Sequence, residues 1–205
     1  MPKRQINENT LLESIWFQPT ATLSYILKNN FTKYVTILLV LGGIARAIDR
    51  AATKNMGDTM DTWLVISIAV FTGGLFGWIG YYIYAWALSE TGKWLDGKAS
   101  SEKIRTVIAW SLVPAVVALL LIIPELVILG DDLFKSEMGA YPQLTIYVIY
   151  FFGILEIVLS IWSIVILVAG LKVVQSFGTG KAILNLILPA LVIAIPIAFV
   201  VVLLR

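Results

Sequence analysis

Long apolar stretches separated by short polar segments make up most of the chain after residue 30. A helix needs about 20 predominantly apolar residues to cross the hydrocarbon core of a bilayer. Five stretches approach or exceed that length: residues 32–48, 62–88, 104–129, 143–171 and 182–204. The pattern therefore predicts an all-α polytopic membrane protein with five transmembrane helices.

The first 30 residues follow a different pattern. Residues 1–13 are mostly polar, and we expect most of them to be flexible. From Pro19 to residue 29, helical spacing places Leu23, Ile26 and Leu27 on one face. We interpret this as a short amphipathic helix at the membrane surface, with Trp16 at headgroup level; an irregular tail is the alternative. The chain then divides into a cytoplasmic N-terminal segment, residues 1–30, and a five-helix domain, residues 31–205.

The amino-acid composition excludes several classes of function. Of the 205 residues, 59% are hydrophobic and 14% are charged, whereas soluble domains carry about 25% charged residues. Cysteine and histidine are both absent, which removes thiolate chemistry and the commonest general base. The polar segments are too short for a soluble catalytic domain. We expect no enzymatic activity, no cofactor, no metal and no nucleic-acid partner.

The basic residues predict the orientation. With the N-terminus inside, ten lysines and arginines face the cytoplasm and five face outward, and this bias sets topology. We therefore expect a protein of the cytoplasmic (inner) membrane, with the N-terminus cytoplasmic and the C-terminus outside.

Two short polar connections contain Gly-Lys pairs: the first basic hairpin, residues 89–103, and the second basic hairpin, residues 172–181. Residues 178–181 do not form a phosphate loop, because Lys181 is followed by alanine and no strand precedes it. We expect contacts with anionic lipid headgroups, worth about 1 kcal/mol per residue near the surface. The expected contact residues are Lys93, Lys98, Lys103, Arg105, Lys172 and Lys181. A second copy of the chain or another membrane protein is a further candidate partner.

Three motifs follow one another along the chain: W-x-x-P, W-S-x-x-P and a longer motif that begins with I-W and ends with G-L-K-x-V-Q, followed by a Lys-Ala pair. Their order and spacing resemble the bacterial branch of the Yip family of five-span membrane proteins. The resemblance implies the five-span fold and topology, and it implies no catalytic residue. It rests on Trp16, Pro19, Trp110, Ser111, Pro114, Ile161, Trp162, Gly170, Leu171, Lys172, Val174, Gln175, Lys181 and Ala182.

Small residues and prolines within the apolar stretches are candidates for helix packing. Gly73 and Gly77 are four residues apart, with Gly80 following, and this spacing lets another backbone come close. We favour a packing face within the chain over a dimer contact. Pro114 and Pro189 interrupt predicted helices; we favour ordinary packing over a binding site lined by broken helices.

Glu156 lies near the middle of the fourth apolar stretch, where an ionisable group is costly and usually faces protein or a cavity. It is either a carboxylate that responds to protons or cations, or a structural carboxyl that is protonated or hydrogen-bonded. Ser160 and Ser163 on the same helix, and Ser111 or Asn185 on neighbours, are the candidate donors.

A second set of charged candidates lies toward the outer face: Arg46, Glu125, Asp131 and Asp132. We favour an ion pair of Glu125 with Arg46 or Arg50. The alternative is an acidic mouth that Glu125 forms with Asp131 and Asp132.

Two functions fit these features. The first is a non-enzymatic membrane scaffold, with an organising or membrane-shaping role through lipid and protein contacts. The second is a small transporter or channel with Glu156 in the pathway. We favour the first on the family resemblance and because few polar residues are available to line a pathway.

Overall fold

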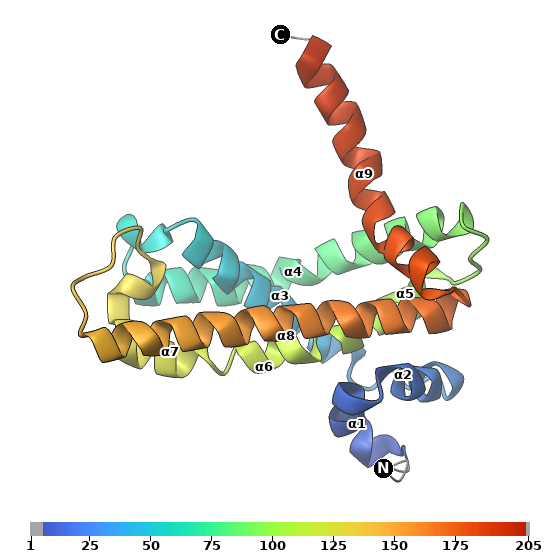
Figure 1. Cartoon of the computed structure of the whole chain (residues 1–205), viewed down its shortest axis with the longest axis horizontal. Helices are drawn as coiled ribbons and strands as arrows, with labels where there is room; N and C mark the ends of the chain where they lie inside the picture. The colour runs from blue at the N-terminus through green and yellow to red at the C-terminus, as the bar shows by residue number, and fades with distance from the viewer. Residues whose placement is uncertain (1–5, 204–205) are drawn as a thin grey trace. The chain divides into compact units, whose positions relative to one another are not determined.

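The computed structural model describes residues 6–203, with side chains described as far as residue 195, and these residues form helices without any strand (Figure 1). In chain order the elements are η1 (Glu8–Thr10), α1 (Leu11–Phe17), α2 (Pro19–Lys28), α3 (Val35–Thr53), η2 (Met56–Asp58), α4 (Thr62–Lys93), α5 (Ser101–Ser111), α6 (Val113–Ala118), α7 (Ile122–Leu129), η3 (Gly130–Phe134), α8 (Gln143–Gln175) and α9 (Thr179–Leu203).

Three helical runs in the described part of the chain are long and apolar enough to cross a membrane. They are α4, α8 and the interrupted run Ser101–Phe134, which contains α5, α6, α7 and η3. The first part of α9, Thr179–Ile195, is a shorter apolar helix. The protein is thus an all-helical membrane protein, and the five-span count stays a prediction.

The third apolar stretch is less regular than its sequence suggests. It is divided at Leu112 and again between residues 119 and 121. Pro114 lies in the first turn of α6, where its missing N–H leaves no hydrogen bond unmade. The interruption expected at Pro189 does not occur, because α9 continues through it.

The N-terminal segment differs from the sequence-based expectation in two respects. Helical structure already begins at Glu8, capped by the Asn7 side chain, so more of residues 1–13 is ordered than the last few that were expected to be. The predicted amphipathic helix is α2, but Leu23 and Ile26 are fully buried within the protein and do not face lipid. A Cβ atom added to Gly170 of α8 would lie 3.1 Å from Leu23, so α2 packs against α8.

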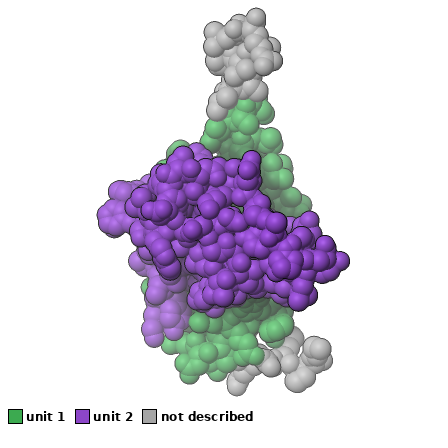
Figure 2. Space-filling model, turned by 90° about the vertical axis from the view of Figure 1, so that its left-hand side faces the viewer, with its two compact units in different colours: residues 1–32, 81–110, 165–205 green, residues 33–80, 111–164 purple. Residues whose placement is uncertain are grey.

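The chain divides into two compact units (Figure 2). Unit 1 contains residues 1–32, 81–110 and 165–205, and unit 2 contains residues 33–80 and 111–164. Both α4 and α8 contribute residues to each unit. The hydrophobic core of unit 2 lies at one end of α3 and is formed by Ile48, Ala51, Val65, Ala69 and Phe134.

Glycines bring the backbones of α3 and α4 together within unit 2. A Cβ atom on Gly43 would lie 2.5 Å from the carbonyl oxygen of Gly73 and 2.9 Å from the Cα atom of Gly77. Only residues without a side chain allow this approach. Gly73 and Gly77 therefore face a helix of the same chain, whereas a Cβ atom added to Gly80 would meet no other atom within 4 Å.

Candidate functional site

Gln175, the last residue of α8, organises the first basic hairpin in unit 1. Its Oε1 accepts the backbone N–H of Ala99 at 2.9 Å, and its Nε2 donates to the carbonyl oxygen of Leu88 at 3.4 Å. The residue is 4% exposed. Gly97 leaves room for it, because a Cβ atom there would lie 2.8 Å from the Gln175 Cδ atom. The amide thus closes the hairpin onto the end of α8.

Asn185 of α9 completes this polar cluster. Its Nδ2 donates to the carbonyl oxygen of Leu88 at 3.1 Å and to the Thr91 hydroxyl at 3.0 Å. The side chain is fully buried. The sequence placed Asn185 among the candidate donors to Glu156, but its amide N–H groups are used within unit 1 at the end of α4.

The two basic hairpins are joined at the surface of unit 1. The Lys181 ammonium donates to the carbonyl oxygen of Leu95 at 3.0 Å and to the Asp96 carboxylate at 3.1 Å. Other basic side chains also have local partners: Lys93 pairs with Glu90 at 2.7 Å, and the Arg105 guanidinium lies 4.2 Å from the centre of the Tyr82 ring.

Several large or charged side chains of the hairpins remain on the surface. Lys93, Lys98 and Lys103 are exposed, and Lys172 is half-buried. Trp94, at the start of the first hairpin turn, is 64% exposed. A tryptophan beside lysines is typical of a membrane headgroup region.

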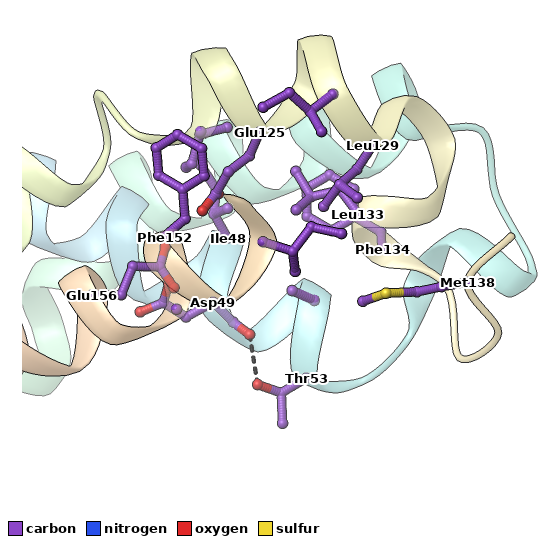
Figure 3. A pocket seen from close by; sticks show the side chains of 15 residues that line it. Ile48, Asp49, Thr53, Glu125, Leu129, Leu133, Phe134, Met138, Phe152 and Glu156 are labelled. Atoms are coloured by element: carbon purple, nitrogen blue, oxygen red, sulfur yellow. Dashed lines mark hydrogen bonds between the residues drawn. The ribbon is translucent and has the colours of Figure 1, made fainter. Parts of the chain in front are cut away.

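Unit 2 contains a cavity of about 360 Å³ (Figure 3). Three carboxylates from three helices line it: Asp49 of α3, Glu125 of α7 and Glu156 of α8. Most of the remaining lining is apolar, including Ile122, Leu129, Phe134 and Phe152. Figure 3 shows the Glu125 side chain extending from α7 toward the side of the cavity where Asp49 and Glu156 lie.

Glu125 is the innermost of the three carboxylates. It is 8% exposed, whereas Glu156 is half-buried and Asp49 is exposed at the rim. Among the described residues no hydrogen-bond donor reaches Glu125, and the expected ion pair with Arg46 or Arg50 does not form. Its nearest charged influences are the like charges of Glu156 and Asp49. The cavity therefore brings three carboxyl groups together without a cation supplied by the described part of the chain.

The family model of the Yip1 domain matches residues 14–201. The chain belongs to the Yip1 family. No curated protein and no solved structure matches it. The polar cluster of unit 1 and the acidic cavity of unit 2 both lie inside the Yip1 domain, and the membrane-length helices make the chain an integral membrane protein.

The serines that were predicted to donate hydrogen bonds to Glu156 do not do so within the described residues. Ser160 is exposed, and the hydroxyl of Ser163 is buried without a hydrogen-bond partner. Ser111 is buried in unit 2. No hydrogen bond joins Glu156 to these serines in the described structure.

Of the three residues of the acidic mouth, the alternative arrangement for the outer face, only Glu125 lines the cavity. Asp132 accepts hydrogen bonds from the Gly139 N–H and the Tyr141 hydroxyl, each at 2.8 Å, and pairs with Lys135 at 3.4 Å. It therefore holds a loop together, and Asp131 is exposed outside the cavity lining. Glu125 lines the cavity together with Glu156 and Asp49 instead. Asp49 is not among the residues predicted from the sequence, although it directly follows the first apolar stretch at the same outer end as Glu125.

Asp58, in a neighbouring loop of unit 2, is a carboxylate that does have a hydrogen-bond partner. Asp58 accepts the backbone N–H of Ser136 at 3.0 Å. This backbone hydrogen bond is the main reason that the pKa of Asp58 lies below its usual range.

Proposed function

We propose that this Yip1 protein is a non-enzymatic membrane scaffold that organises or shapes the bilayer through lipid and protein contacts. The joined basic hairpins of unit 1 are the observation that supports this role. Gln175 and Asn185 hold the hairpin backbone from inside, while Lys98, Lys103 and Trp94 lie on the surface. A fixed, basic, tryptophan-bearing end suits contact with anionic headgroups.

The proposed topology has five spans in the inner membrane, with the N-terminus and both hairpins cytoplasmic. Because the chain has no cysteine, single cysteines report the side of each loop. We expect Lys98→Cys and Thr179→Cys to resist an impermeant thiol reagent in intact cells and to react after permeabilisation. Glu137→Cys, in the loop after η3, is the control that should react from outside. Labelling of both hairpin variants in intact cells would overturn the orientation.

The scaffold role is tested by reconstitution at equal protein density into vesicles with and without anionic lipid. We expect smaller or tubular vesicles by electron cryomicroscopy when anionic lipid is present. The triple variant Lys93→Gln, Lys98→Gln, Lys103→Gln removes three charges worth about 1 kcal/mol each, and it should lose the effect. Lys54→Gln, on the predicted outer side, is the matched control. Vesicles shaped like protein-free ones, with the unmodified protein present, would refute the proposal.

A second candidate function is a small transporter or channel with Glu156 in its pathway. The acidic cavity favours it, because three carboxylates line a space large enough to hold a small molecule. The test is cation-dependent flux into vesicles, which Glu156→Gln should abolish while the protein remains folded.

A further inference from the structure

The ionisable side chains that line the acidic cavity of unit 2 are all acidic. Its lining contains Asp49, Glu125 and Glu156, and no lysine or arginine occurs among the described lining residues. Burying a carboxylate without a partner is unfavourable, whereas a cation placed beside it restores the lost stabilisation. Glu125 is more than nine-tenths buried, points into the space and has no hydrogen-bond donor among the described residues. The missing partner must therefore be a positively charged ligand or a proton.

The rest of the lining indicates what kind of cation fits. Hard metal ions such as Mg²⁺ and Ca²⁺ need six or more oxygen ligands held close together. In the part of the chain that the structure describes, no three acidic, histidine or cysteine side chains are close enough to hold a metal ion. The volume of about 360 Å³ also exceeds what a bare ion fills, and apolar and aromatic side chains form most of the wall.

We propose that this cavity binds an organic amine. The ammonium group lies between the carboxylates of Glu125 and Glu156, with Asp49 at the rim, and the apolar body packs against Ile122, Leu129 and Phe152. Carboxylates recognise the charge through charge-assisted hydrogen bonds, and the aromatic rings add cation–π attraction. This inference rests on the same acidic cavity as the second candidate function, the transporter or channel. It requires that the amine binds there, but not that it is transported.

The first test compares two probes of nearly equal shape on the full chain in lipid nanodiscs. Phenethylamine has an ammonium group and a phenyl ring, and 2-phenylethanol has a neutral hydroxyl in place of the ammonium. We expect phenethylamine to raise the Tm in a saturable manner by a few degrees, because a ligand that binds only the folded state stabilises it. The alcohol should leave the Tm unchanged. Equal shifts from both probes, or a shift from Mg²⁺ alone, would overturn the proposal.

Variants then locate the site. Glu125→Gln and Glu156→Gln keep the side-chain shape and remove one charge each, so each should weaken phenethylamine binding by about tenfold or more. Asp131→Asn removes an exposed acidic residue outside the cavity lining and should bind as the unmodified protein does. Unchanged affinity in both glutamine variants would place the amine elsewhere and refute the site.

A second measurement does not depend on the carboxylate variants. Gly153 lines the cavity, and a Cβ atom there meets no other atom within 4 Å, so Gly153→Cys is expected to fold. In this cysteine-free chain, saturating phenethylamine should slow alkylation of the new thiol. Gly80→Cys, which also has open space but lies outside the cavity lining, should be unaffected. Equal rates with and without amine at Gly153→Cys would contradict the proposal.

Amine binding and cation flux into vesicles are measured in separate experiments. Amine binding without flux supports the inference and removes the second candidate function. Flux of an inorganic cation without amine binding refutes the inference and leaves that function standing.

Discussion

The polar cluster of unit 1 and the acidic cavity of unit 2 differ in how their buried polar side chains are partnered. In unit 1, Gln175 and Asn185 both donate to the carbonyl oxygen of Leu88, and Gln175 also accepts the backbone N–H of Ala99. In unit 2, Glu125 and Glu156 line a cavity without a hydrogen-bond donor from the described residues. Both arrangements place polar side chains among apolar helices, where such groups are costly unless they are partnered.

The difference separates structural polar residues from candidate binding residues. The Gln175 amide uses both its oxygen and its nitrogen in hydrogen bonds to the chain, whereas Asn185 keeps a buried Oδ1 without a hydrogen-bond partner among the described residues. A side chain with unmet needs beside an open space can accept a ligand. Burial alone therefore does not identify a functional residue, and the partner of each polar atom must be known.

The largest expected effect of a single change lies in unit 1. Gln175→Ala leaves the buried N–H of Ala99 without an acceptor and opens a small void, so it should lower the free energy of unfolding by about 2–3 kcal/mol. Reversible unfolding in mixed detergent micelles measures this loss. Gln143→Ala, at the exposed start of the same helix, is the control and should change little. If the two variants lose equal stability, unit 1 does not depend on its polar cluster.

Unit 2 should respond in the opposite direction. Glu125→Gln and Glu156→Gln each remove a charge from a group of like charges, so unfolding free energy should stay the same or rise by up to about 1 kcal/mol. The same detergent unfolding measures it. A loss of about 3–5 kcal/mol, typical of a broken buried ion pair, would show that a cation of the chain neutralises these carboxylates.

The smallest effect concerns the partnered carboxylate of unit 2. The Ser136 N–H lowers the folded pKa of Asp58 below the unfolded value of about 3.9. The charged form therefore stabilises the loop above about pH 4, and this contribution is lost as the pH falls through the folded pKa. The amide NMR shift of Ser136 should follow this titration.

Two variants complete the Asp58 experiment. Asp58→Asn should remove the acid titration of the Ser136 amide, and the exposed Asp61→Asn should preserve it. A titration that persists in Asp58→Asn would mean that another group reports at this amide.

Much of the fold could be predicted from the sequence because apolar length is a strong signal. α4 begins at Thr62 and α8 at Gln143, as expected from the first residues of their apolar stretches. The helix breaks on either side of α6 are harder to predict from the sequence. Pro114 indicates the first break, but residues 119–121, where the second break lies, are all leucine and do not indicate one. The early start of helical structure at Glu8 depends on the Asn7 cap and on the burial of Leu11. The apolar pattern of the chain does not reveal either of these features.

The candidate site was harder to predict. Glu156 and Glu125 stood out because acidic residues are rare within apolar stretches. Their meeting with Asp49 depends on how three helices pack, which spacing along one helix does not reveal. For the same reason Asn185 is only one of several candidate donors to Glu156 by sequence, whereas packing brings it to Leu88 and Thr91.

The glycine contact between α3 and α4 limits how the cavity can open. Where Gly43 meets Gly73 and Gly77, backbone touches backbone, so a slide along the helix axis by one residue would drive a side chain into the facing main chain. The pair is therefore locked in a single axial register and moves as one body. Since Ile48 and Asp49 of the cavity wall belong to α3, that wall is stationary relative to the part of α4 in unit 2. Because Asp49 is exposed at the rim, a ligand can reach the cavity beside this fixed wall without any change in the register of α3 and α4.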